Sequence, residues 1–419
     1  MTLLSLARHS LANRRGSALL VVVSLALSVV LLLGVERLRH QLRQSFASTV
    51  SGVDLIVGAR SGPLNLLLYS VFRIGEPTAN VSWRSVEAMA AMPEVSWLVP
   101  LSLGDSHQGY PVLGTTTAYF EHYRHGRDQA LRLQQGRVFE DLFDTVLGAN
   151  VARALGYQQG DRITLAHGTG AVSLVEHADK PFRVVGILAP TGTPVDNTVH
   201  VSLQAIEALH ADWMAGMPVP GLSLSPEQLR QRSLTPRSVT AVMVGLQSRI
   251  AVFQLQRDIN TWRDEPLMAI IPGVALQQLW QMLGMVERTL ELIAALVVLV
   301  ALMVMWTALL ATLGERRREM AILRALGARP TQLLLLVLGE TLLLASAGAL
   351  LGVLLLQGGS LMLAPWLSQQ LGMTVALWPP SSKEFILLAL VWLAALLAGL
   401  WPAWRAYRQT LADGLGMRL

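Results

Sequence analysis

The chain has 419 residues, of which 52% are hydrophobic and 15% are charged, and its formal net charge is +5. Its apolar residues are gathered in four long runs, which is typical of a membrane protein. The absence of cysteine excludes disulfides, thiolate metal sites and cysteine nucleophiles. Many arginines stand at the ends of apolar runs, where they set membrane topology, so the basic excess does not indicate nucleic-acid binding.

A transmembrane helix needs about 20 apolar residues, and four apolar runs of this chain are close to that length. Arginines precede the first run and follow the fourth, and five arginines lie between the second and third. The positive-inside rule therefore predicts that both termini are cytoplasmic. The expected order is a cytoplasmic interfacial helix (1–16), transmembrane helix 1 (17–35), an external domain (36–289), transmembrane helix 2 (290–313), a cytoplasmic connector (314–332), transmembrane helix 3 (333–356), an external loop (357–384), transmembrane helix 4 (385–403) and a cytoplasmic tail (404–419).

Both ends of the external domain carry apolar stripes that recur at helical steps of three and four residues. We expect the two stripes to pack together as a stalk that continues from the membrane helices. The alternative is that each stripe packs separately on the globular domain. The residues expected at the stalk seam are Leu38, Leu42 and Phe46 on one helix and Leu279, Leu283 and Val286 on the other.

The external domain between the stalk helices has a mixed pattern of short apolar runs and amphipathic stretches. Strands are predicted at 162–166, 182–188, 199–203 and 239–246, and helices at 83–92, 146–155 and 250–262. Gly156 and Gly160 are expected to end elements where the chain turns. The fold class is therefore an α-helical membrane protein with four transmembrane helices and an α+β domain inserted between helices 1 and 2.

Two apolar stretches of the external domain, 64–72 and 213–221, have no obvious place in these elements. They are either surfaces for a partner or lipid, or segments buried at an interface. In the third transmembrane helix, Gly348 and Gly352 form a small-xxx-small pair, which permits close helix approach within or between subunits.

The connector between transmembrane helices 2 and 3 is predicted to be a short amphipathic helix. Its apolar residues share a broad face, Gly327 is expected to end the helix, and Pro330 suits the first turn of the next one. An anchor that only sets topology needs charge but no apolar stripe, so the connector is interpreted as a docking element. The residues assigned to docking are Glu315, Arg317, Arg318, Glu319, Met320, Ile322, Leu323, Arg324 and Gly327.

The layout of the chain, the connector at 315–328 and the pattern from Gly136 to Leu188 together resemble the MacB/FtsX/LolC-type permeases. These are membrane subunits of ABC transporters that act by mechanotransmission (the type VII group). The resemblance implies a MacB-like periplasmic core domain, a coupling helix in the connector, and residence in the bacterial inner membrane. It also implies two ABC ATPase partners and a second permease copy, giving a homodimer or a pair with a close paralogue. The segment from Asp54 to Gly75 departs from the exporting members.

No nucleotide-binding or hydrolytic motif is present. The only lysines, Lys180 and Lys383, do not stand in a P-loop, so ATP and magnesium are expected on the partner ATPase. We expect no cofactor in this chain, no catalytic residue, and no metal ligand. The one metal alternative that the sequence offers is Glu121 with His122 and His125 on one helical face.

The function expected from this reasoning is a permease subunit that couples ATP hydrolysis on a separate chain to work on a periplasmic protein or lipid cargo. The first alternative is an FtsX-like relay that regulates a periplasmic partner and moves no cargo. A second alternative is a part of a metal-handling system. Because the apolar runs are expected to contain no ionisable group, the work is expected to be delivered outside the bilayer.

Overall fold

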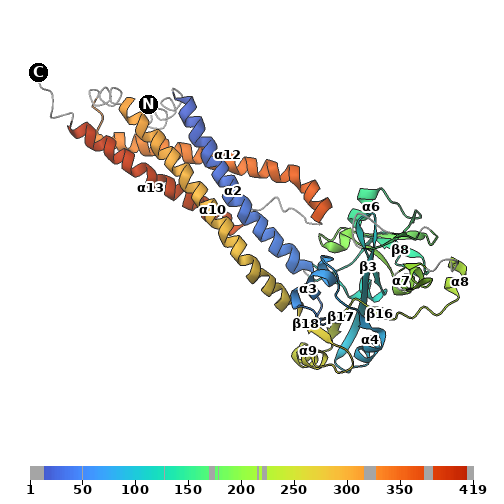
Figure 1. The fold of residues 1–419 in the computed structure, drawn as a ribbon. Helices are drawn as coiled ribbons and strands as arrows, with labels where there is room; N and C mark the ends of the chain where they lie inside the picture. The colour runs from blue at the N-terminus through green and yellow to red at the C-terminus, as the bar shows by residue number, and fades with distance from the viewer. Residues whose placement is uncertain are drawn as a thin grey trace, which may run out of the picture. The chain divides into compact units, whose positions relative to one another are not determined.

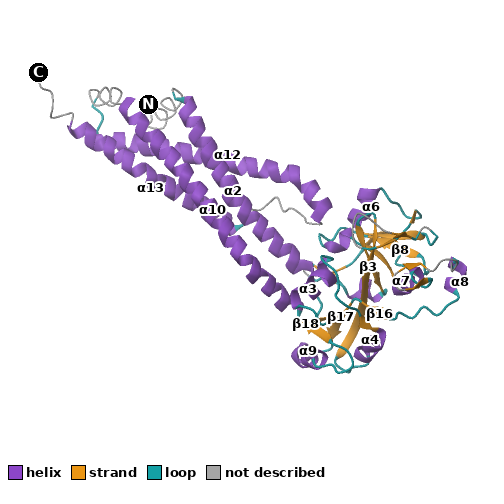
Figure 2. Cartoon of the chain, in the orientation of Figure 1, coloured by secondary structure: helices purple, strands orange, loops and turns teal. Residues whose placement is uncertain are grey.

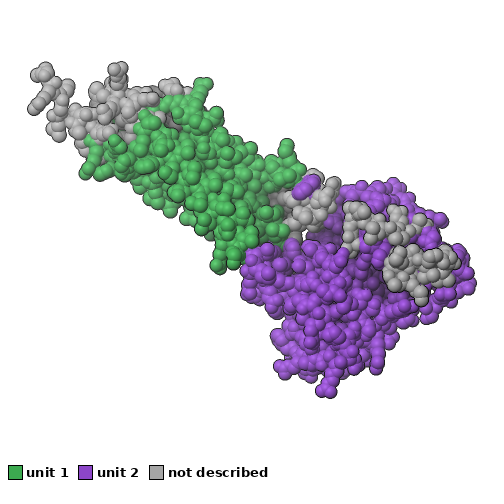
Figure 3. Space-filling model, viewed as in Figure 1, with its two compact units in different colours: residues 1–42, 284–364, 375–419 green, residues 43–283, 365–374 purple. Residues whose placement is uncertain are grey.

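The computed structural model describes residues 14–49, 51–126, 128–168, 175–177, 179–214, 217–218, 224–315, 327–371 and 381–412. The chain divides into two compact units (Figure 3). The helical unit comprises residues 1–42, 284–364 and 375–419, and the sheet unit comprises residues 43–283 and 365–374. Figure 2 shows that the strands belong to the sheet unit, whereas the described part of the helical unit is built from long helices.

Four long helices each contain a stretch that is long and apolar enough to cross a membrane, as predicted. The helices are α2 (Arg15–Thr49), α10 (Pro272–Glu315), α12 (Pro330–Leu371) and α13 (Ser382–Ala412) (Figure 1). Three of them, α2, α10 and the last turns of α12, continue without a break from residues of one unit into residues of the other. The interfacial helix expected at 1–16 lies almost entirely outside the described residues.

The external loop expected at 357–384 is corrected in part, because α12 continues to Leu371 and α13 begins at Ser382. Leu361, Met362 and Leu363 extend the apolar character of α12 beyond the predicted boundary. Backbone groups that stay in the hydrocarbon must be hydrogen-bonded within the chain, so a longer apolar stretch favours a longer helix. Helix α13 likewise extends to Ala412, into the segment expected to be a tail.

Small residues let α12 lie close to α2 within the helical unit. A Cβ added at Gly348 would stand 2.6 Å from Leu25 Cβ, and one at Gly352 would stand 2.8 Å from the Ala26 carbonyl oxygen. Both distances are shorter than real carbon contacts. The small-xxx-small pair therefore serves packing within one chain, which is the first of the two alternatives left by the sequence.

The sheet unit contains one large sheet whose main path runs β18-β1-β17-β3-β4-β13-β8-β12-β7 (Figure 1). The pairs β4–β13 and β8–β12 are parallel, and the other neighbours on this path are antiparallel. The strands on the path are β1 (Leu55–Ala59), β3 (Val95–His107), β4 (Tyr110–Thr115), β7 (Leu133–Gly136), β8 (Asp144–Leu147), β12 (Phe182–Leu188), β13 (Val199–Ser202), β17 (Ala241–Leu246) and β18 (Leu267–Ile270).

Short strands and helices complete the sheet unit. The remaining strands are β2 (Val81–Ser82), β5 (Arg124–His125), β6 (Gln129–Ala130), β9 (Arg162–Ile163), β10 (Ala166–His167), β11 (Val175–Glu176), β14 (Trp213–Met214), β15 (Met217–Pro218) and β16 (Ser238–Val239). The helices are α3 (Pro63–Leu67), η1 (Leu68–Phe72), α4 (Trp83–Ala90), α5 (Ala118–His122), α6 (Ala149–Leu155), η2 (Pro194–Asn197), α7 (Leu203–Leu209), α8 (Pro226–Arg230), η3 (Arg249–Ala251) and α9 (Val252–Asn260).

Strand β3 joins the two halves of the sheet. Its first half pairs with β17 and its second half pairs with β4, so this one strand of 13 residues runs through both halves of the sheet. Each half has its own apolar cluster, one containing Leu55, Val242 and Leu255 and the other containing Phe143 and Phe182. A third cluster, which contains Leu66, Tyr69 and Tyr119, lies around η1 and α5.

Most elements predicted for the domain are confirmed. Strands β12, β13 and β17 and helices α4 and α9 match the predicted segments, and Gly156 ends α6 in a left-handed conformation with φ of 72°. The prediction of a helix from Val146 is wrong at its start, because Val146 and Leu147 form strand β8 between β12 and β13. A short buried apolar run before a glycine does not distinguish strand from helix. The strand expected at 162–166 is split into β9 and β10.

The apolar stretch 64–72 is not a surface for a partner. It forms α3 and η1, and Leu66, Leu67 and Tyr69 are each at most 1% exposed. The second stretch is described only as the short pair β14–β15, and its remaining residues lie outside the described part of the chain.

We predict that Gly352→Val destabilises the helical unit by about 1–3 kcal/mol, because the new side chain would overpack the contact between α12 and α2. The matched control is Gly358→Val in the same helix, since a Cβ at Gly358 meets no atom within 4 Å. Thermal unfolding of the purified chain in detergent measures both. Equal unfolding midpoints for the two variants would show that α2 and α12 are not in close contact.

Candidate functional site

The connector assigned to docking lies largely outside the described residues. Arg317, Arg318, Glu319, Met320, Ile322, Leu323 and Arg324 are in this segment, and Glu315 is described only as the last residue of α10. Gly327 has a φ of 92°, the left-handed conformation expected of a residue that ends a helix. Pro330 is the first residue of α12, as predicted.

A cluster of charged and polar side chains joins all four long helices of the helical unit. We call it the charged collar, and its members are Glu36, Arg37 and Arg39 of α2, Glu291 of α10, Gln357 of α12, and Lys383 and Glu384 of α13. All seven residues belong to the helical unit.

Arg37 is the centre of the collar. One of its terminal nitrogens donates to Gln357 Oε1 at 2.6 Å, and the other donates to Glu384 Oε2 at 2.9 Å. The side chains of Arg37 and Glu384 are only 10% and 7% exposed. A charge so far removed from water costs free energy unless it is paired and hydrogen-bonded. The bidentate donor geometry of arginine meets that need with partners on two other helices.

Arg39 links the collar to α10 by an ion pair with Glu291. Its guanidinium contacts Glu36 Oε2 at 2.5 Å and Glu291 Oε1 at 2.6 Å, and Lys383 Nζ lies 3.9 Å from Glu36 Oε1. Positive and negative groups therefore alternate from α10 through α2 to α13. The arrangement fixes the relative register of the helices at this level of the bundle.

The expected stalk seam is divided between the two units. Leu38, Leu42 and Val286 belong to the helical unit, and Phe46, Leu279 and Leu283 belong to the sheet unit. Leu38 is 49% exposed, Val286 57% and Leu283 39%. Phe46 and Leu279 pack against the same buried cluster of the sheet unit. The pairing of the whole seam stays a prediction.

Within the sheet unit, α2, η1 and α10 meet in an aromatic contact. The ring centroid of Phe46 lies 4.4 Å from that of Phe72 and 5.6 Å from that of Trp280, the latter in an edge-to-face arrangement. The Arg43 guanidinium lies 5.5 Å from the centre of the Trp280 ring. These contacts connect the end of α2 to the start of α10 and to η1.

Helix η1 leads from this aromatic contact to a pocket of about 290 Å³. Tyr69 and Arg73 line the pocket together with Glu76, Asp105 and His167. Arg73 has a φ of 60°, which is uncommon for a residue with a Cβ, and its guanidinium bonds the Ser70 carbonyl. Burial raises the pKa of Tyr119, beside Arg73, to about 12, so this phenol stays protonated at physiological pH.

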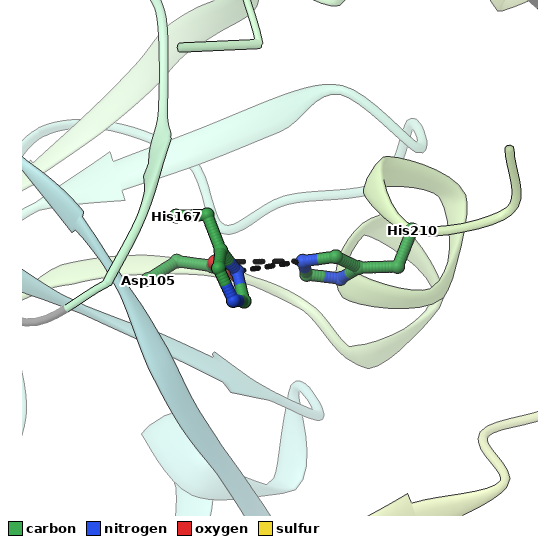
Figure 4. Close-up of side chains that lie close together, drawn as sticks. All are labelled: Asp105, His167 and His210. Carbon is green, nitrogen blue, oxygen red and sulfur yellow. Dashed lines mark hydrogen bonds and ion pairs between the residues drawn. The ribbon is translucent and has the colours of Figure 1, made fainter. Parts of the chain in front are cut away.

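Histidines of the sheet unit meet at a different place from the one the sequence suggested. His122 stacks on Trp97 at 4.8 Å, and His125 belongs to the short strand β5. Among the described residues, one group of His, Asp and Glu side chains has ligand atoms close enough for a metal: Asp105, His167 and His210. Figure 4 shows these three side chains pointing toward one another from separate elements.

The distances within this group are short. His167 Nδ1 lies 3.1 Å from both Asp105 Oδ1 and His210 Nε2, and His210 Nε2 lies 3.6 Å from Asp105 Oδ1. The hydrogen bond to Asp105 raises the pKa of His167. His177, whose ring lies 5.6 Å from that of His210, is 3% exposed, and burial lowers its pKa to about 4.

The expectation of spans without ionisable groups is wrong. Glu340 lies within the apolar stretch of α12 and is 1% exposed, and Glu291 of the collar lies near the start of the second run. The sequence already shows both residues as single glutamates within runs of apolar residues. An acidic residue inside a span is a candidate functional residue, because its charge is costly in an apolar environment.

No short sequence motif predicts the collar or the group around Asp105, because their members are far apart in the chain. Arg37 and Glu384 are 347 residues apart, and His167 and His210 are 43 apart. The only sequence signal for the collar is that charged residues stand at the same ends of successive apolar runs.

Comparison with known families gives two matches that together cover most of the chain. Residues 17–262 match the family described as the MacB-like periplasmic core domain. Residues 291–411 match the family described as the FtsX-like permease C-terminal region.

Two curated relatives are similar to the chain at 25% identity. The lipoprotein-releasing system transmembrane protein LolC of Neisseria meningitidis serogroup B matches over 221 residues, which are 51% of this chain and 48% of that protein. The macrolide export ATP-binding/permease protein MacB of Sodalis glossinidius matches over 341 residues, which are 77% of this chain and 46% of that protein. The chain thus spans about half the length of these relatives.

Two solved structures are similar at 11% identity. The periplasmic region of MacB from Actinobacillus actinomycetemcomitans is matched over 98% of its length and 56% of this chain, with a TM-score of 0.34. The extracellular domain of the ABC-type transporter YknZ from Gram-positive bacteria is matched over 98% of its length and 52% of this chain, with a TM-score of 0.31.

We predict that Arg37→Gln destabilises the helical unit by about 2–3 kcal/mol, because it leaves the Glu384 carboxylate without its cation in a largely buried position. The exchange of both charges, Arg37→Glu with Glu384→Arg, should recover part of that loss. Arg288→Gln, at an exposed position of α10, is the control and should have little effect. Denaturant unfolding in detergent measures all three. An equal loss in Arg37→Gln and the charge-exchanged chain would exclude a specific pair.

Proposed function

Because the chain belongs to the MacB-like periplasmic core domain family, as its sequence resemblance predicted, we propose that it is the membrane subunit of an ABC transporter that couples ATP hydrolysis on a separate chain to work in its sheet unit. The observation that carries the proposal is the succession of the two family matches along one chain with four apolar helices. Members of this permease family are subunits of ABC transporters and work with ABC ATPases.

The proposed assembly has two ATPases and two permease copies, since four spans are few for a complete transporter. In this arrangement the termini and the connector are cytoplasmic and the sheet unit is periplasmic, as the distribution of arginines indicates. ATP and magnesium bind the ATPase, and this chain contributes no catalytic group. The cargo is a periplasmic protein or a lipid-linked molecule, by analogy with the lipoprotein-releasing function in the name of the LolC relative.

The connector is the proposed input of the mechanism. Arg317, Arg318 and Glu319 set the docking register by charge, while Met320, Ile322 and Leu323 fill an apolar groove of the ATPase. Closure of two ATPases on ATP moves the two connectors, and α2 and α10 carry the movement onward because both are continuous helices. The output is a changed affinity of the sheet unit for its cargo or partner.

We predict that Ile322→Asp with Leu323→Asp raises the dissociation constant of the ATPase by about 100-fold or more, since each unpaired carboxylate would be buried in an apolar groove. Permease-dependent ATP hydrolysis should then be lost in reconstituted vesicles, while membrane insertion is retained. The matched control is Ala321→Asp with Ala325→Asp, which adds the same charge to the opposite face of the predicted helix.

Full ATP hydrolysis in the Ile322/Leu323 variant would overturn the docking assignment. Capture of a folded periplasmic protein by the sheet unit, with no transfer of lipid or lipoprotein, would favour the signal relay over the transporter.

A further inference from the structure

The group formed by Asp105, His167 and His210 has the geometry of a metal-binding triad. The three residues come from different elements of the sheet unit: Asp105 from β3, His167 from β10, and His210 from the residue that ends α7. Strand pairing holds two of them, because His167 is the register partner of Asp105 between β10 and β3. The backbone thus positions the carboxylate and one imidazole before any ion is bound.

The distances between the ligand atoms fit a tetrahedral ion. Zinc binds histidine nitrogen and carboxylate oxygen at about 2.0–2.2 Å, which places tetrahedral ligand atoms roughly 3.3–3.6 Å from one another. The three separations in the group are 3.1, 3.1 and 3.6 Å. One ion can therefore lie within bonding distance of all three atoms after shifts of a few tenths of an ångström.

The orientation of His210 is also that of a ligand. Its Nδ1 lies 2.9 Å from the Ile206 carbonyl oxygen, which has only acceptor capacity, so Nδ1 carries the proton and Nε2 presents a lone pair to Asp105 and His167. Metal-binding histidines commonly donate their other ring N–H to a carbonyl or carboxylate in this way. The side chain of Asp105 is 3% exposed, so its negative charge calls for a cation nearby.

The group is accessible. Asp105 and His167 line the pocket of about 290 Å³ described above, while His210 approaches from the α7 side. The side chain of His167 is 44% exposed and that of His210 is 27% exposed. An ion held by the three side chains would have a fourth position open to water or to a ligand from the pocket, the arrangement of zinc sites with three protein ligands.

We propose that Asp105, His167 and His210 bind one divalent transition-metal ion of the zinc class in the sheet unit. The donor set of two imidazoles and one carboxylate suits zinc and cobalt better than calcium or magnesium, which prefer oxygen ligands. This site replaces the metal alternative at His122 and His125 and departs from the expectation of no metal ligand. It is independent of the proposed ATP-driven function, because binding requires only the folded sheet unit.

The test is titration of the full chain, purified in detergent and freed of metal, with zinc chloride alone. One saturable equivalent per chain is expected. His210→Ala should weaken binding at least about 10-fold, since even the loss of a residue that only orients a metal ligand costs that much. His122→Ala removes a histidine of the same unit outside the group and should leave the affinity unchanged.

Cobalt provides a readout that does not depend on a variant. A tetrahedral site with nitrogen and oxygen ligands gives cobalt strong visible absorption, and that absorption should appear with one equivalent and disappear on adding zinc. Asp105→Asn, which keeps the shape of the side chain, should abolish the spectrum while the circular dichroism of the chain is retained. A wild-type chain that gives no such spectrum, or zinc binding that is unchanged by His210→Ala, would overturn the proposal.

Discussion

The charged collar is the contact on which the arrangement of the four long helices depends. Apolar side chains give little preference for one helix packing over another in lipid, because lipid tails are as apolar as leucine. Close packing at Gly348 and Gly352 and polar contacts between helices must supply the specificity. Arg37 and Arg39 supply it at one level of the bundle, since between them they contact residues of α10, α12 and α13.

The collar matters for the proposed mechanism because α2 and α10, two of the helices that it joins, continue into residues of the sheet unit. Helices α2 and α10 are continuous, and within the sheet unit their residues Phe46 and Trp280 are in contact. Phe46 also packs on Phe72 of η1, and η1 carries Tyr69, which lines the pocket beside Asp105 and His167. In the proposed mechanism, a movement of α2 relative to α10 changes the shape of this pocket through the packed aromatic rings. Such a series of contacts couples two sites only if nucleotide binding to the ATPase and binding at the pocket both shift it between the same two arrangements.

The sequence predicted the architecture well because the bilayer imposes strong rules on it. Spans of fixed length, arginines at their ends and glycine pairs are all local signals, and the structure confirms the four apolar helices and the α+β domain. Prediction failed where the outcome depended on neighbours. Val146 and Leu147 are a strand because β12 and β13 flank them, and residues 64–72 are buried because the sheet unit closes over them.

The candidate sites were harder to predict for the same reason. The collar, the aromatic contact at Phe46 and the group around Asp105 each bring together residues far apart in the chain, and local periodicity in the sequence does not predict such contacts. His122 and His125 were predicted as a metal alternative because they are near in sequence. His167 and His210, in contrast, are brought together by a strand and by the end of a helix. Glu340 is the opposite case, since a single acidic letter in an apolar run was visible from the start.

The coupling between α2 and α10 is measured most directly by disulfide crosslinking between cysteines placed at Leu42 and Leu283, in a chain that has no cysteine of its own. The assembled complex in vesicles would be compared without nucleotide, with a non-hydrolysable ATP analogue, and after ATP hydrolysis. If α2 and α10 transmit force as a paired stalk, the crosslinking yield should change between these states, and locking the pair should stop the periplasmic output. No crosslink in any state, or an equal yield in all of them with output retained in the locked chain, would contradict the account.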